Sequence, residues 1–261
     1  MRTLRIVLVL MIAGHLRVSA QQRDEPRFDV VSIKPNTSGS AASSLRPDAN
    51  GVTGINVSLL RLMRVAYQVP EFQIVDAPGW FESERFDLQA RAEGTVSIAQ
   101  LQQMVRGMLT DRFGLRVRAE RRALSGYELR LERSDHAGRR ASPQPCAVAQ
   151  ADQPRATGEL PPCFRATAGE LHARGVPMAM VAQQLQGYVN QPMVNRTALD
   201  GFFDFELRWR PDTAPASEAV VDPDAPSIFT AVREQLGLRL VSARVTVDAY
   251  AIVDATRPDP D

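Results

Sequence analysis

The sequence predicts an α+β protein made of two tandem duplicated units, each with two helices packed on a mainly antiparallel sheet. Three observations lead to this prediction. Short segments alternate apolar and polar residues, as half-buried strands do. Between them lie amphipathic segments that carry helix start and stop signals. Finally, similar blocks recur in the same order in the two halves of the chain, 117 to 123 positions apart.

Residues 1–20 have the features of a cleavable signal peptide. Arg2 and Arg5 provide a basic start, residues 6–14 form a short apolar run, and Val18-Ser19-Ala20 supplies small residues at a cleavage site. The apolar run is shorter than the roughly 20 residues that a membrane-spanning helix needs. We therefore predict a periplasmic or secreted protein with no transmembrane segment after cleavage. Retention of the leader as a membrane anchor is the alternative.

The charge balance argues against a nucleic-acid partner. The chain has 31 basic and 30 acidic residues, and the leader holds three of the arginines and no acid. Without it, 28 basic residues face 30 acidic ones, a net charge of −2. Such a surface has no basic excess with which to bind a phosphate backbone.

The first unit is predicted over residues 21–133. A strand over residues 28–33 is followed by a Ser/Gly/Ala/Asn-rich loop that runs to residue 51. A helix capped by Asn56 or Ser58 comes next, and then a strand over residues 85–91 whose residues alternate between apolar and polar. Ser97, with Gln100 three residues later, forms a capping box that opens the next helix.

A glycine ends this helix, and a hairpin is predicted after it. Gly114 lies where a left-handed helix cap belongs. Beyond it, residues 115–131 are predicted to form a local hairpin that turns at Ser125-Gly126.

Residues 134–175 are predicted to form a Pro-rich linker or long excursion. The segment holds both cysteines, Cys146 and Cys163, and in an oxidising compartment such a pair usually forms a disulfide. Closing a loop of this length stabilises a fold by about 3 kcal/mol. A zinc site is the weaker alternative, because no histidine stands at finger-like spacing.

The second unit is predicted over residues 176–261 and repeats the first plan. Pro177 opens a helix, residues 203–209 alternate as a strand, and Gly237 ends a further helix. Residues 238–247 and 249–255 are predicted to form a second hairpin.

Matching positions in the two units support an internal duplication. Phe86-Asp87 corresponds to Phe203-Asp204, at a spacing of 117 residues. Gly114 and Gly237 are 123 residues apart, and so are Tyr127 and Tyr250. Coincidence between two common αβ patterns is the alternative explanation.

Several ordered blocks together resemble a secreted domain family of unknown function that is expanded in soil Acidobacteria. The blocks are Phe28-Asp29-Val30-Val31-Ser32-Ile33-Lys34-Pro35-Asn36, Ala66-Tyr67, Gly79-Trp80, Arg85-Phe86-Asp87, Met108-Leu109-Thr110-Asp111-Arg112-Phe113-Gly114-Leu115, Gly201-Phe202-Phe203-Asp204-Phe205 and Gln235-Leu236-Gly237-Leu238. Some members of that family are fused to membrane metallopeptidases similar to β-lactam sensor-transducers, which implies a sensing or binding role outside the cytoplasm. The family has no assigned catalytic residues. Each unit also resembles the short N-terminal domain of secretins and TonB-dependent receptors, which is a protein-interaction module.

The candidates for ligand binding are two aromatic residues, Tyr67 and Trp80, and two acids, Asp87 and Asp204. Core packing is the alternative role for the aromatic side chains, and solvation on the polar sheet face is the alternative for the acids. No nucleophile elbow, metallopeptidase helix or phosphate-binding glycine loop occurs in the sequence. We predict no metal, no cofactor and no catalytic residue.

These observations favour a non-enzymatic binding module whose partner is an envelope or extracellular protein or a glycan. The first alternative is a secreted hydrolase of polysaccharide or peptide that uses Asp87, Asp204 or Glu206. The second is a ligand-sensing domain that works with a membrane metallopeptidase.

Overall fold

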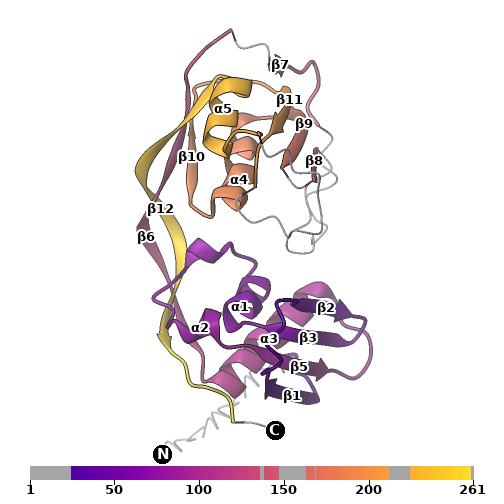
Figure 1. Cartoon of the computed structure of the whole chain (residues 1–261). Coiled ribbons are helices and arrows are strands. Elements are labelled where there is room, and N and C mark those ends of the chain that lie inside the picture. Colours follow the sequence, from indigo (N-terminus) through magenta and orange to yellow (C-terminus); the bar gives the residue numbers. More distant parts are fainter. Residues whose placement is uncertain (1–24, 136–137, 147–162, 168, 212–223, 260–261) are drawn as a thin grey trace, which may run out of the picture.

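Five helices and three four-stranded sheets make up the described part of the chain (Figure 1). The computed structural model describes residues 25–135, 138–146, 163–167, 169–211 and 224–259. Two separate apolar cores define a first and a second unit, and two long strands run between them. The predicted α+β class is therefore confirmed. Among the described residues, no helix combines the length and apolar character needed to cross a membrane.

In the first unit, two helices pack against an antiparallel sheet. In spatial order, the strands are β1 (Val30–Pro35), β5 (Phe86–Arg91), β3 (Gly51–Val57) and β2 (Ser44–Asp48). The remaining elements are α1 (Leu59–Tyr67), the 3₁₀ turn Glu71–Gln73, β4 (Ile74–Val75), α2 (Trp80–Ser83) and α3 (Ile98–Phe113). Ser58 caps α1, and the Ser97–Gln100 capping box begins α3, as predicted.

The loop predicted before residue 51 is wrong in its second half. Residues 44–57 form the β2–β3 hairpin, in which Asp48 pairs with Gly51 across Ala49-Asn50. Val52 is buried and Leu45 packs against the same core, so the apolar residues of this polar-rich segment have a sheet face to cover.

In the second unit, α4 (Met178–Val189) and α5 (Ile228–Leu236) contribute buried residues to one core with another antiparallel sheet. The strands, in spatial order, are β7 (Arg139–Ala141), β11 (Phe203–Arg208), β9 (Glu170–Val176) and β8 (Phe164–Thr167). β7 and β8 lie within residues 134–175, and β9 ends one residue beyond them. The described part of the predicted linker is thus largely sheet, because Phe164 and Leu171 are buried in this core.

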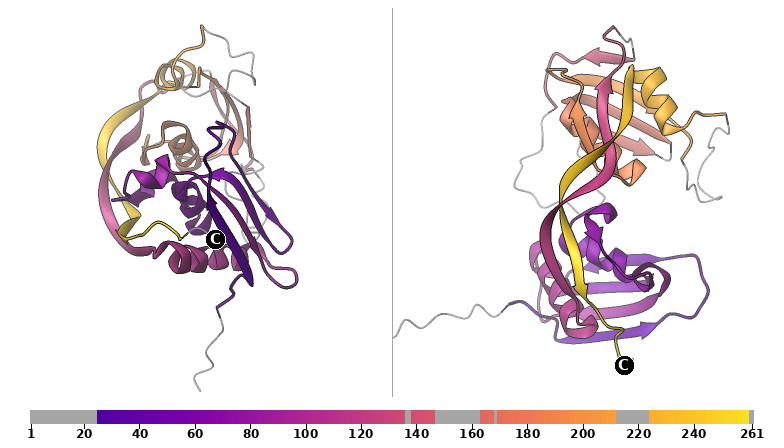
Figure 2. Two further views of the ribbon diagram at one scale, coloured as in Figure 1. Left: turned by 60° about the horizontal axis from the view of Figure 1, so that its bottom comes forward. Right: turned by 90° about the vertical axis from the view of Figure 1, so that its left-hand side faces the viewer.

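The two units are joined by an antiparallel ribbon of β6 (Arg116–Leu131) and β12 (Leu238–Asp254), seen in Figures 1 and 2. Pairing runs from Leu238 opposite Leu131 to Asp254 opposite Arg116. The two predicted local hairpins, over residues 115–131 and 238–255, are therefore wrong. Each strand begins in one unit, ends in the other, and pairs with the other strand throughout.

Gly126, predicted as a turn residue, lies inside β6 instead. β10 (Met193–Arg196) runs parallel to β6 there, and a Cβ on Gly126 would collide with the backbone oxygen of Pro192. Glycine is needed for this close approach of two backbones and not for a turn.

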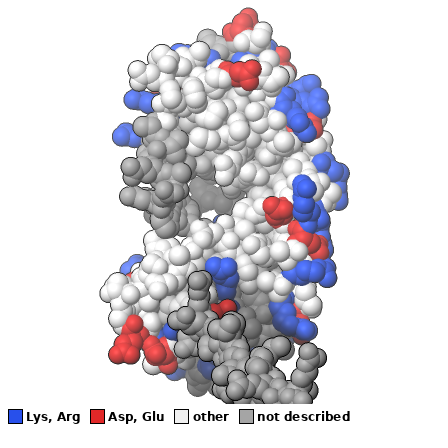
Figure 3. All heavy atoms as spheres, turned by 180° about the vertical axis from the view of Figure 1, so that it is seen from behind, with Lys and Arg blue, Asp and Glu red and all other residues white. Residues whose placement is uncertain are grey.

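Arginine and acidic side chains are interspersed along the ribbon, which follows the right-hand side of Figure 3. Arg122 donates from both terminal nitrogens to the Asp76 carboxylate at 2.7 Å, and its Nε donates to Glu120 at 2.7 Å. Asp76 directly follows β4, which pairs with β12, so these bonds fasten the first unit to the ribbon. Hydrogen bonding to Arg122 lowers the pKa of Asp76.

We expect the Asp76–Arg122 contact to weaken in acid. A carboxyl whose pKa is lower in the folded state stabilises the fold above its unfolded-state pKa of about 4, and this stabilisation is lost as the pH falls. Arg122→Gln should therefore reduce the change in unfolding free energy between pH 7 and pH 3, measured by urea denaturation. Arg121→Gln is the control, since Arg121 and its partner Asp248 are highly exposed. Equal pH dependence in both variants would contradict the assignment.

Candidate functional site

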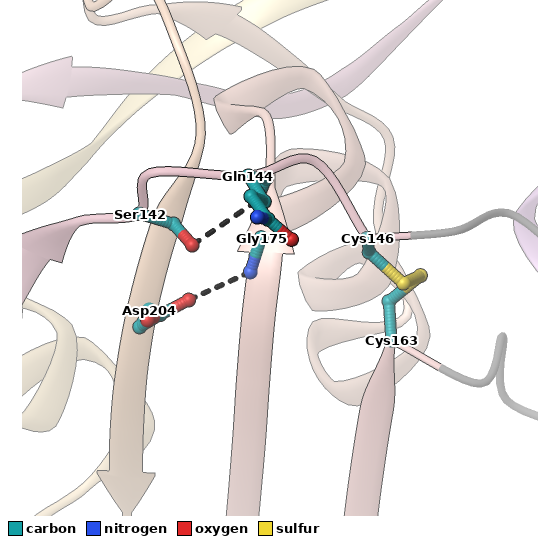
Figure 4. The surroundings of a disulfide bond; sticks show 6 residues. All are labelled: Ser142, Gln144, Cys146, Cys163, Gly175 and Asp204. Carbon is teal, nitrogen blue, oxygen red and sulfur yellow. Dashed lines mark hydrogen bonds between the residues drawn. A yellow bond between two sulfur atoms is a disulfide. The ribbon is translucent and has the colours of Figure 1, made fainter.

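The carboxylates of Asp87 and Asp204 each accept a hydrogen bond from a backbone N–H. Asp87 Oδ1 accepts hydrogen bonds from the Asn56 N–H at 2.9 Å and from the Asn36 side-chain amide at 2.8 Å. Asp204 Oδ1 accepts a hydrogen bond from the Gly175 N–H at 2.7 Å (Figure 4). The two acids lie in different sheets, on β5 and β11, and do not form a pair.

Both N–H groups belong to irregular points in a strand just before a helix. Asn56 has φ of 54° and Gly175 has φ of 61°, and the sheet register shifts at each place. An N–H at such a bulge leaves the regular ladder and needs another acceptor. The carboxylates provide it, which gives Asp87 and Asp204 a structural task at the start of α1 and α4.

Asp87→Ala is expected to lower the free energy of unfolding by about 1–3 kcal/mol, because it leaves the N–H of buried Asn56 without its acceptor. Asp87→Asn keeps an oxygen in that position and should lose less than half as much. Urea denaturation measures both changes, with exposed Gln89→Ala on the same strand as the control. Equal losses for the alanine and asparagine variants would contradict this role.

Tyr67 and Trp80 both pack against the chain's own C-terminal part. The ring centroids of Tyr67 and of Tyr250 on β12 are 4.7 Å apart, and burial raises the pKa of Tyr67. The Arg257 guanidinium lies 5.2 Å from the Trp80 ring centre and bonds to Glu84. Both aromatic residues are half-buried, and their roles as ligand contacts remain predictions.

A cluster of charged side chains crosses β9 and β11. His172 lies in β9, with its ring nitrogens 3.2 Å from a Glu170 carboxylate oxygen and 3.4 Å from a Glu206 carboxylate oxygen. Arg208 donates to Glu170 at 2.8 Å and so lowers the pKa of that carboxyl. Across the described ranges, no group of three or more His, Cys, Asp or Glu residues is arranged to hold a metal ion.

An apolar pocket opens between the β2–β3 hairpin and the two main helices of the first unit. Its volume is about 150 Å³. The pocket is lined by Leu45 and Pro47 of β2, Val52 of β3, Leu62 and Val65 of α1, and Ile98, Leu101, Gln102 and Val105 of α3. Ile98, although large and apolar, is 42% exposed.

A polar hollow of about 510 Å³ adjoins the apolar pocket, and we call it the arginine depression. Leu45 and Val65 line both spaces. The other residues of the depression are Ser58, Leu60, Arg61, Arg64, Glu71, Glu82 and Arg85. Its three arginines exceed its two glutamates, so the depression has a net positive charge.

Of the features predicted from the sequence, the disulfide is confirmed. Cys146 and Cys163 are bonded, and they join the segment after β7 to the residue before β8 (Figure 4). Cys146 also donates its N–H to the Gly175 oxygen at 2.8 Å. The bond therefore holds an edge of the second sheet next to the bulge that Asp204 stabilises.

Residues 60–255 match the model of a family described as a protein of unknown function (DUF3738). The match runs from α1 past the end of β12 and so includes the second unit, the ribbon and the part of the first unit that follows β3. The chain belongs to this family. The expectation of a domain family of unknown function is thereby confirmed. No curated protein and no solved structure matches the chain.

The DUF3738 match covers only part of the pocket wall. The lining residues of α1 and α3 lie inside it, whereas Leu45, Pro47 and Val52 precede it. The pocket of this DUF3738 protein was not predicted from the sequence. Ile98, Leu101 and Val105 recur at helical spacing, as the residues of a buried helix face do, and the facing β2 strand lies in the segment predicted to be a loop. The Asn50-Gly51 pair flanked by Leu45 and Val52 was the signal that could have revealed the second wall.

Proposed function

We propose that this protein is an exported, non-enzymatic binding module that acts in the periplasm or outside the cell. Its partner is an envelope or extracellular component. The signal-like residues 1–20 and a disulfide typical of oxidising compartments support export.

The observation that carries the binding role is the apolar pocket beside the arginine depression. A concave apolar surface with a few polar groups at its rim is the usual form of a ligand site. The acids on which the hydrolase alternative depends are otherwise engaged. Asp87 and Asp204 hold bulge N–H groups in separate sheets, and Glu206 lies in a cross-strand charge cluster.

Duplication of one unit is part of the proposal. The two sheets have corresponding orders, β1-β5-β3-β2 and β7-β11-β9-β8, with every neighbouring pair antiparallel. In the ribbon, Ala123 pairs with Thr246, which is 123 residues later, the same spacing that separates Gly114 from Gly237. An approximate twofold axis at this pair would relate the units. An experimental structure in which the two units fail to superpose at these spacings would contradict the duplication.

Site-specific photocrosslinking in intact cells tests the proposed function. A photoreactive residue at Ile98 should give a defined adduct, and one at Val253 should not, although both side chains are exposed. Val65→Asp, which places a charge in the pocket wall, should abolish the adduct. Adducts that are the same at both positions, or that persist in Val65→Asp, would contradict a pocket-centred function.

Export is tested separately by cell fractionation. The full chain should be found outside the cytoplasm with its cysteines oxidised, whereas a chain without residues 1–20 should stay inside with both thiols free. Cytoplasmic retention of the full chain would contradict export.

A further inference from the structure

We propose that the apolar pocket and the arginine depression form a single site for a carboxylate joined to one apolar group the size of a phenyl ring or a branched aliphatic side chain. This inference rests on the proposed binding function and names its ligand class.

One wall of the site comes from a helix extension that the described part of the second unit lacks. Helices α3 and α5 both end directly before a left-handed glycine, Gly114 and Gly237, yet α3 has 16 residues and α5 has nine. The first seven residues of α3 thus have no counterpart in α5, and they include Ile98, Leu101 and Gln102 of the pocket wall. In the second sheet, β8 has the edge position that β2 has in the first sheet. It begins with Phe164, which is buried beside the disulfide. Because α3 has this extension beside a hollow and α5 lacks it, the extension indicates a specialised surface on the first unit.

The volume of the pocket limits the apolar part of the ligand. A dry cavity of about 150 Å³ with aliphatic walls holds a molecule the size of benzene. The apolar pocket has this volume, and all but one of its lining residues are apolar. It therefore suits one ring or one branched side chain, and a long acyl chain would exceed it.

The charges of the depression specify the polar part. Arg64 Nη1 lies 3.8 Å from Glu71 Oε2. Arg61 donates a hydrogen bond to the Ser43 hydroxyl at 2.8 Å, which fixes the direction of the Arg61 guanidinium. Arg85 is exposed at the rim of the same hollow. Arginine binds carboxylates with paired N–H donors, and a surplus of one positive charge matches a singly charged anion.

The two spaces share Leu45 and Val65, so a ligand can place its apolar group in one and its carboxylate in the other. Two sources offer this chemistry: a free aryl or branched-chain acid, and the C-terminal residue of a polypeptide. The second source has an additional contact available. β2 stands at the edge of its sheet, and an extended peptide can pair along such an edge.

Titration calorimetry on the oxidised protein without its leader tests the site. The probes are N-acetyl-phenylalanine, its amide, and the tetrapeptide Ala-Ala-Ala-Phe. We expect both acids to bind and the amide to bind at least tenfold more weakly. Arg85→Gln should weaken binding of the acids by about tenfold, the effect of losing one charged hydrogen bond. Arg121→Gln, an exposed arginine on the ribbon, is the matched control and should bind like wild type.

The outcomes separate the sources and the hypotheses. Much tighter binding of the tetrapeptide identifies a polypeptide C-terminus, and equal binding identifies a free acid. Either result supports the site, provided that thermal melting shows Arg85→Gln to be folded. Equal binding of acid and amide, or no binding of either acid, overturns the ligand class. If the Ile98 crosslink in cells still appears in that case, the proposed function stands and only this inference fails.

Discussion

Phe113→Ala is expected to lower the free energy of unfolding by about 3–5 kcal/mol. The Phe113 side chain is completely buried, and its ring meets that of Phe86 edge-to-face with centroids 5.4 Å apart. It is the last residue of α3, and its backbone oxygen accepts a hydrogen bond from Thr256 at 2.7 Å. Removing the ring leaves a cavity where α3, the first sheet and the segment after β12 meet. The loss is a large share of the 5–15 kcal/mol that stabilises an ordinary domain.

The two tryptophans allow the units to be followed separately, because Trp80 packs against the first core and Trp209 lies within the second. Urea unfolding is monitored by Trp80 fluorescence in a Trp209→Phe background. The transition should occur at a clearly lower urea concentration with Phe113→Ala than without it. The control is Val253→Ala, because Val253 is 52% exposed and its truncation should change stability by less than about 0.5 kcal/mol. A loss below 1 kcal/mol for Phe113→Ala would show that the ring does not support this core.

Replacing both cysteines by serine is expected to destabilise the second unit by about 3 kcal/mol. Cys146 and Cys163 are 17 residues apart, and a loop of about this length contributes that amount through the entropy of the unfolded chain. Cys163 is buried in the same core as Trp209, so the Trp209 transition should report the loss.

Treatment with reductant provides the matching control. It should shift the Trp209 transition of the wild-type protein and leave that of the Cys146→Ser/Cys163→Ser variant unchanged. The Trp80 transition should move little in either protein, because the bond lies wholly in the second unit. A wild-type protein with identical stability before and after complete reduction would refute the structural role of the disulfide.

The local signals of the sequence were sufficient for most helices and for three strands, β1, β5 and β11. Ser97 and Gln100 satisfy the first N–H groups of α3 wherever the helix packs, so its start is predictable from side-chain chemistry alone. The alternation in β5 and β11 likewise places Phe86 and Phe203 inside. These features depend on residues that are close in sequence.

Such local signals could not predict the candidate site. Leu45, Val65 and Ile98 come from three separate elements, and each alone has the character of an ordinary core residue. A hollow forms only because the longer α3 and the edge strand β2 meet without filling the space between them. Conversely, Asp87 and Asp204 were candidates for ligand binding in the sequence. In the structure, each accepts a hydrogen bond from the backbone N–H of a bulge.

The amino-acid sequence by itself determined the α+β class, the helix caps, the buried faces of β5 and β11, and the pairing of the two cysteines. Only the tertiary structure decided which strands pair in the ribbon. The alternating residues of β6 and β12 suit a local hairpin and a long exchanged ribbon equally well, since either arrangement buries Leu129 and Leu238. The choice depends on the packing of two cores far apart along the chain, which no local pattern of side chains encodes.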